Sequence, residues 1–147
     1  MRCEVPVIFD DSHTFEPGKS VTLREGNDVA IISTGMMTPK ALDAADALAK
    51  DGVSVRLIHM PSVKPIDEET IIAAAKEIGR IVTVENHSII GGLGGAVTEV
   101  TAERAPARVR RIGFRDHFGK SGDDEKVFSM FGANTEHIVA AAREMST

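Results

Sequence analysis

The sequence has a single cysteine, lacks the two largest aromatic residues and has no long apolar run. Cys3 is the only cysteine, which excludes an internal disulfide and a thiolate metal cluster. The chain has six phenylalanines but no tryptophan or tyrosine, so stacking platforms for bases or sugars are not expected. No segment is apolar over the length that crosses a bilayer, and the amino terminus lacks a signal-peptide core. These absences favour a cytoplasmic protein with no membrane partner.

An excess of charge of either sign is also missing. The 17 basic and 22 acidic residues give a formal net charge of -5, which argues against nucleic-acid binding. Hydrophobic residues make up 42% and charged residues 27% of the chain, as is typical of soluble globular proteins. A length of 147 residues suits one domain with a buried core.

Strand-like and helix-like patterns alternate along most of the chain. This order is typical of a parallel sheet built by right-handed crossovers, so the predicted fold class is a three-layer α/β architecture. The first two strands flank a turn-like stretch at residues 25–28 and are predicted to form a hairpin. Strands are predicted at residues 20–24, 29–33, 53–60, 80–85 and 109–114, and helices at 39–50, 68–78, 96–104, 124–131 and 135–142.

Three features place the ends and edges of these elements. Thr38 followed by Pro39 predicts the start of the first helix, with Thr38 as its N-cap. Asp67 is predicted to cap the second helix. Five arginines lie between residues 104 and 115 with no acid among them, which favours an edge position for the last strand and leaves an anion patch as the alternative.

A glycine cluster precedes the third helix. A glycine turn that leads into a helix presents backbone amides to an anion, so the cluster is a candidate anion site. It matches no nucleotide fingerprint, because Val97 stands where the dinucleotide motif needs a small residue and no phosphate-loop lysine is present. The alternative is that the glycines allow close packing.

Glu85 and His87 lie at the carboxyl end of a predicted parallel strand, where open α/β sheets bind ligands. Residues two apart share a strand face, so the two side chains are a possible acid/base pair. Ser88 lies in no Gly-x-Ser-x-Gly elbow, which makes an independent hydrolase the weakest hypothesis. The histidines have no metal-ligand spacing. No catalytic, cofactor or metal residue is assigned, and the candidate anion or interface residues are Glu85, His87, Gly91, Gly92, Gly94 and Gly95.

Four blocks of sequence resemble the carboxyl-terminal domain of transketolases and their thiamine-diphosphate relatives. Together they span about residues 18 to 145, and their order and spacing are more specific than any single block. The resemblance implies an α/β/α domain with a five-stranded, mostly parallel sheet and one antiparallel strand. The blocks are residues 18–35 (GKSVTLREGNDVAIISTG), 55–67 (VRLIHMPSVKPID), 84–94 (VENHSIIGGLG) and 113–122 (GFRDHFGKSG).

The resemblance also explains why the sequence shows no complete catalytic, cofactor or metal site. In that family two preceding domains hold thiamine diphosphate and magnesium across a dimer interface, and the third domain supplies no cofactor ligand. The metal-binding Gly-Asp-Gly motif is absent here, and Glu85 does not correspond to the family's catalytic acid. Residues 1–17 would be a linker or extension and residues 18–147 the domain.

The resemblance therefore implies a dimer-stabilising scaffold, inactive alone, in an enzyme that moves a two-carbon ketol unit between sugar phosphates. Its expected partners are the remaining transketolase domains or an amino-terminal subunit, in a homodimer. The alternative is an anion-binding regulatory module of a deoxyxylulose-phosphate synthase or a 2-oxo-acid dehydrogenase beta subunit.

Overall fold

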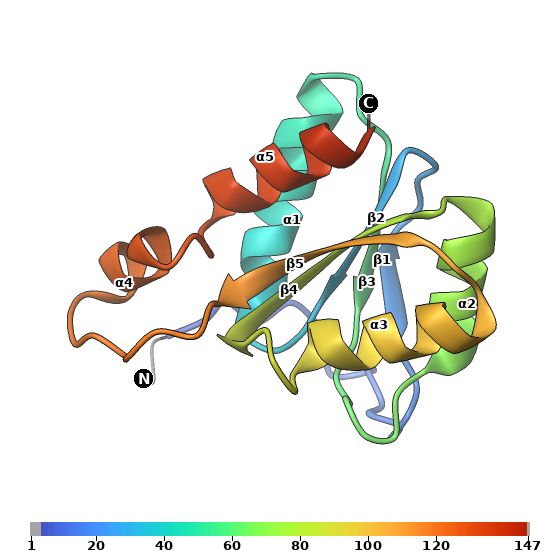
Figure 1. Cartoon of the computed structure of the whole chain (residues 1–147), viewed down its shortest axis with the longest axis horizontal. Coiled ribbons are helices and arrows are strands. Elements are labelled where there is room, and N and C mark those ends of the chain that lie inside the picture. The colour runs from blue at the N-terminus through green and yellow to red at the C-terminus, as the bar shows by residue number, and fades with distance from the viewer. Residues whose placement is uncertain (1–3, 147) are drawn as a thin grey trace.

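The computed structural model describes residues 4–146, which form a five-stranded sheet between two layers of helices (Figure 1). Helices α1 and α5 pack on one face of the sheet, and α2 and α3 on the other. The predicted α/β/α fold is confirmed. The strands are β1 (Val21–Arg24), β2 (Val29–Ser33), β3 (Val55–His59), β4 (Arg80–Ser88) and β5 (Arg108–Phe114). The helices are α1 (Met37–Lys50), α2 (Glu68–Glu77), α3 (Leu93–Arg104), α4 (Asp124–Met130) and α5 (Thr135–Ser146).

Strand β2 is the centre of the sheet, whose order is β1-β3-β2-β4-β5. It pairs in parallel with β3 on one side and with β4 on the other. Ile31 packs with the α1 and α5 side of the core, whereas Ala30 and Ile32 pack with the α2 and α3 side. Burial on both faces explains why this strand is apolar without alternation.

The predicted hairpin between the first two strands is wrong. Strand β1 pairs antiparallel with β3, which lies between β1 and β2. The turn before β2 instead crosses the start of β3, where a Cβ on Gly26 would lie 2.2 Å from the carbonyl carbon of Val55. The amide of Asp28 donates to the carbonyl oxygen of Ser54 at 2.9 Å. Because both edges of β2 are taken by parallel neighbours, β1 cannot pair with β2, and it pairs instead at the outer edge of β3.

The helix starts confirm one predicted cap and correct another. Asp67 caps α2 by accepting a hydrogen bond from the Thr70 amide, as predicted. Helix α1 begins at Met37 with no side-chain cap, so the prediction for Thr38 is wrong. The hydroxyl of Thr38 lies 2.8 Å from Nδ1 of His59, a long-range contact that takes it away from the helix end.

Other boundaries move by a few residues, and the outer elements lie where expected. Helix α3 starts at Leu93, three residues earlier than predicted, and β5 is an edge strand as predicted. Helix α4 lies beyond the carboxyl end of β5 (Figure 1), and its Phe128 ring lies 5.8 Å from the ring of Phe114 between centroids. Within residues 4–146 no helix is long and apolar enough to span a membrane.

Candidate functional site

The carboxylate of Glu85 occupies the amino terminus of α3. Its two oxygens accept hydrogen bonds from the backbone amides of Leu93 at 2.7 Å and Gly94 at 2.8 Å. Glu85 is 1% exposed, so this is a buried carboxylate held by helix amides that otherwise have no intrahelical partner. The anion at this glycine turn is therefore a side chain of the same chain.

Two of the glycines are required by the packing of this carboxylate and of the strand beneath. A Cβ on Gly92 would lie 1.9 Å from Oε2 of Glu85. A Cβ on Gly94 would lie 2.8 Å from Oγ1 of Thr83 and equally close to the Arg111 side chain. The close-packing interpretation is confirmed for these two positions. At Gly91 and Gly95 a Cβ would meet nothing within 4 Å, although Gly91 has a positive φ of 74°.

This geometry gives no support to an external anion at the turn. The amides of Leu93 and Gly94 already bind Glu85, and a second anion would meet its negative charge. Gly91 and Gly92 also border a hollow of about 580 Å³. The charged side chains that line it are three carboxylates and two cations: Glu68, Glu99, Glu103, Lys64 and Arg104.

Glu85 and His87 do not form the predicted acid/base pair. His87 is exposed, and its Nδ1 lies 2.9 Å from the carbonyl oxygen of Ser88. The pairing of β4 with β5 shifts register between Val84 and Ser88, and Asn86 and His87 are both exposed. A bulge of this kind breaks the two-residue alternation on which the prediction rested.

The residues at this edge do not fit the diphosphate of thiamine diphosphate or its divalent ion. Such a group needs free amides or a set of oxygen ligands, and the amides here are engaged by Glu85. Among residues 4–146 no three His, Cys, Asp or Glu side chains come together in a metal-binding group.

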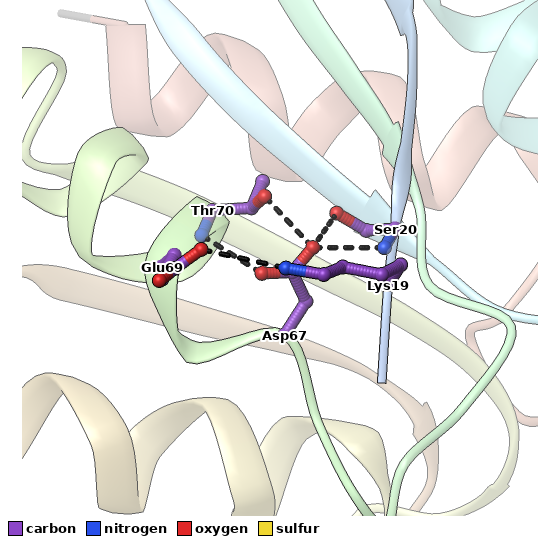
Figure 2. Close-up of polar contacts among 5 residues, drawn as sticks. All are labelled: Lys19, Ser20, Asp67, Glu69 and Thr70. Carbon is purple, nitrogen blue, oxygen red and sulfur yellow. Dashed lines mark hydrogen bonds and ion pairs between the residues drawn. The ribbon is translucent and has the colours of Figure 1, made fainter. Parts of the chain in front are cut away.

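A polar junction at Asp67, a residue whose sequence context predicts only a helix cap, joins β1 to α2 (Figure 2). One carboxylate oxygen of Asp67 accepts from the amide and the hydroxyl of Ser20, both at 2.8 Å. The carboxylate also accepts from the amide of Thr70 at 3.1 Å and from its hydroxyl at 3.0 Å. Lys19 and Glu69 form an exposed ion pair at 3.5 Å beside it.

Hydrogen bonding lowers the pKa of the carboxyl at this junction. Burial raises the pKa of the Asp67 carboxyl, but the hydrogen bonds from Ser20 and Thr70 outweigh it, so the pKa lies below its ordinary value. Close by, a Cβ on Gly18 would lie 3.1 Å from Cγ of Pro65. The only signal in the sequence was that residues 18–20 and 61–67 both belong to the resembling blocks.

A second contact missed by the sequence analysis surrounds His59 at the carboxyl end of β3. His59 contacts the Thr38 hydroxyl, which in turn accepts from Ser33 at 3.1 Å. The ring of Phe9 lies 5.3 Å from the His59 ring and stacks on His13 at 4.0 Å, measured between centroids. Burial, and secondarily the charge of His13, lowers the pKa of His59.

The arginines around β5 are used partly within the chain. Arg111 donates to the carbonyl oxygen of Ile89 at 2.9 Å, and Arg110 lies 3.7 Å from Glu144. Arg108 is exposed on the edge strand. This pattern is that of a charged sheet edge, which discourages pairing with other strands.

The family of the chain follows from a match over most of its length. The sequence model described as "Transketolase, C-terminal domain" matches residues 18–138. The chain belongs to this family. The match covers the whole sheet and reaches into α5, so the domain described above is the transketolase C-terminal domain.

Two curated relatives and one solved structure show what this transketolase C-terminal domain resembles. The chain is 42% identical over 139 residues to the 6-deoxy-6-sulfo-D-fructose transketolase subunit of a Clostridium species, covering 95% of the chain and 43% of that protein. It is 38% identical over 144 residues to the 1-deoxy-D-xylulose-5-phosphate synthase of Heliobacterium modesticaldum, covering 97% of the chain and 22% of the synthase.

Among solved structures, a split-gene transketolase described as an inactive β4 tetramer matches with a TM-score of 0.93 and 42% identity, over 97% of this chain and 46% of that one. The chain thus spans less than half the length of each of these relatives.

Proposed function

We propose that this chain is the carboxyl-terminal scaffold domain of a transketolase that transfers a two-carbon ketol unit between sugar phosphates. It packs against the other domains of the enzyme, or against a separate amino-terminal subunit, and stabilises a homodimer. The chain has no catalytic residue of its own and is inactive alone.

The observation that carries this proposal is the family match over residues 18–138, combined with a span of 43% to 46% of transketolase subunits. Because the chain corresponds to less than half of these subunits, we infer that it functions together with the remaining domains. The internal pairing of Glu85 with the α3 amides supports a structural role for the glycine turn. The assembly described for the split-gene relative supports association between subunits.

Thiamine diphosphate and magnesium belong, in this proposal, to the preceding domains. The chain's own part is to fix the shape of the surface on which those domains rest. Glu85 does this at the carboxyl end of β4, where it ties the first turn of α3 to the strand. Asp67 does the same at the start of β1.

The second candidate is the corresponding domain of a deoxyxylulose-phosphate synthase, favoured by 38% identity over 97% of the chain. The 42% identity to transketolase subunits favours the first candidate. The anion-binding regulatory role that accompanied this alternative has lost its most direct support, because Glu85 occupies the amides at the glycine turn.

The test combines titration with reconstitution. Thiamine diphosphate with magnesium is titrated calorimetrically into the chain alone, and no heat of binding is expected. The chain is then mixed with the polypeptide that carries the remaining domains. We expect transfer of two-carbon units between sugar phosphates to rise above that of the remaining domains without the chain.

Two outcomes would contradict the proposal. Cofactor binding by the chain alone would place the cofactor site on this domain. Formation of 1-deoxy-D-xylulose 5-phosphate by the mixture, without transfer between sugar phosphates, would support the second candidate instead.

A further inference from the structure

The segment before β1 crosses the carboxyl edge of the sheet and contacts it at successive points. Val5 and Pro6 border a hollow of about 420 Å³ with Met36, at the start of α1, and Phe128 of α4. Phe9 then reaches His59 at the end of β3. This edge is where open α/β sheets bind ligands, and here the chain's own residues lie over part of it.

Phe9 makes the central contact of this segment. Its ring contacts two imidazoles, with His59 at 5.3 Å and His13 at 4.0 Å between ring centroids. The stacking on His13 is close to parallel, with an angle of 14° between the rings. Phe9 is half-buried, whereas Val7 beside it is 91% exposed. The contact is therefore specific to one side chain of the segment.

His59, which contacts the Phe9 ring, is itself held by hydrogen bonds within the domain. His59 is 8% exposed, and its Nδ1 contacts Thr38 of α1, which contacts Ser33 of β2. Three elements therefore hold this imidazole in one orientation. An imidazole whose orientation is restrained in this way offers a preformed face for an aromatic partner.

The segment on the other side of Phe9 is held as well. His13 donates its amide to the carbonyl oxygen of Asp10 at 3.1 Å, which closes a turn that brings His13 back onto Phe9. Residues 13–16 then border a hollow of about 200 Å³ with Pro61 and the start of β1. The path ends at Ser20, which is fixed by two hydrogen bonds to Asp67.

We propose that the carboxyl end of β3 is an interaction surface whose occupant is residues 8–17 of this chain, docked as a fixed strap through Phe9. The strap is ordered in solution instead of acting as a flexible linker. Polypeptide that precedes residue 8 is thereby directed to one corner of the domain, beside α1 and α4. The docking of residues 8–17 does not depend on the proposed function. Only the placement of a preceding domain rests on the proposed function.

The test compares two phenylalanine truncations in the 147-residue chain. In the Phe9→Ala variant we expect cleavage after Phe15, which is 57% exposed, by chymotrypsin to become about tenfold faster, because an aromatic contact of this kind holds the strap closed. The ¹H–¹⁵N heteronuclear NOE of residues 10–16 should fall toward that of a mobile loop. The control is Phe118→Ala, which removes an equal ring that is 99% exposed and should leave both readouts unchanged.

The melting temperature separates strap release from unfolding of the domain. It should change little in either variant, since Phe9 lies outside the two core clusters. Low heteronuclear NOE values at residues 10–16 in the unchanged chain would overturn the proposal, as would equal cleavage rates in the Phe9→Ala variant and the control. Neither result bears on reconstitution of transketolase activity, so the two proposals fail independently.

Discussion

At the scale of single residues, the most consequential side chain is Glu85. It gives two buried amides their acceptors and links β4 to α3. A glutamate at the end of a parallel strand suggests a catalytic role. Here its carboxylate oxygens lie 2.7 and 2.8 Å from the amides of Leu93 and Gly94, so the carboxylate has a structural role at the start of α3. The neighbouring glycines leave space for this side chain. A Cβ on Gly92 would overlap Oε2 of Glu85, and a Cβ on Gly113 would lie 2.9 Å from its Cγ.

We predict that Glu85→Ala lowers the free energy of unfolding by about 3 kcal/mol, because it leaves two buried donors without acceptors. Glu85→Gln keeps one acceptor oxygen and should lose about half as much. Urea denaturation monitored by circular dichroism measures both variants. Equal stability of Glu85→Ala and the unchanged chain would show that water satisfies these amides.

Two glycines at the start of α3, the N-cap Gly92 and the helical Gly95, allow a matched comparison. Gly92→Ala should cost about 2 kcal/mol, because the added Cβ overlaps Oε2 of Glu85 and forces the helix start to shift. Gly95→Ala should instead add about 0.5–1 kcal/mol, since it places a better helix former where a Cβ meets nothing within 4 Å. The pair is measured by thermal and urea unfolding. Destabilisation of equal size at both positions would contradict the packing argument.

At the scale of elements, Asp67 connects a helix cap to an edge strand. It caps α2 and also binds Ser20 just before β1, so one carboxylate sets where β1 lies against the rest of the sheet (Figure 2). Strand β1 has four residues and a single neighbouring strand, so it gains little from its own ladder. The junction is therefore expected to matter most for the order of β1.

The lowered pKa of Asp67 fixes the sign of its pH dependence. A carboxyl with a folded pKa below the unfolded value of 3.8 adds stability that is present above pH 3.8 and is lost as pH falls through the folded pKa. We expect Asp67→Asn to be about 1–2 kcal/mol less stable than the unchanged chain at neutral pH. The difference should shrink in the acid range below 3.8.

Hydrogen exchange provides the second readout for this junction. In the Asp67→Asn variant the amides of β1 should exchange faster, whereas those of β2 should keep their protection because that strand is central. Ser20→Ala serves as the matched control for the hydroxyl bond alone, and its effect should be smaller. A stability difference that is constant down to pH 2 would contradict the assignment of Asp67 as the titrating group.

At the scale of the whole molecule, stability is expected to come from the two apolar layers and not from surface charge. One cluster joins the sheet to α1 and α5, and the other joins it to α2 and α3. The ion pairs among residues 4–146 each have at least one largely exposed side chain. Such pairs contribute little to folding.

We therefore predict a weak dependence on ionic strength. Between low salt and about 0.3 M sodium chloride, the free energy of unfolding should change by less than about 1 kcal/mol. Urea unfolding at several salt concentrations measures it. The Glu85→Ala variant should show the same weak dependence, because the bonds it removes are buried and little screened. A steep loss of stability with salt would mean that the surface pairs act as a network.

The sequence by itself determined the order of the elements, the α/β class and the family. These follow from local patterns, as with the unbroken apolar run of residues 29–33, the cap at Asp67 and the arginines that suit an edge strand. Only the tertiary structure decided that β1 pairs with β3, that Glu85 fills the glycine turn and that Phe9 reaches His59.

The physical reason is the range of the interactions. Propensity and hydrophobic period act within a few residues, whereas a strand edge, a buried carboxylate and an aromatic contact depend on which surfaces the finished fold leaves free. Strand β1 lies at the outer edge of β3 because β3 and β4 occupy both edges of β2, which is a property of the whole sheet. The amides of α3 could bind Glu85 only once a bulge and a tight turn had brought them over the end of β4.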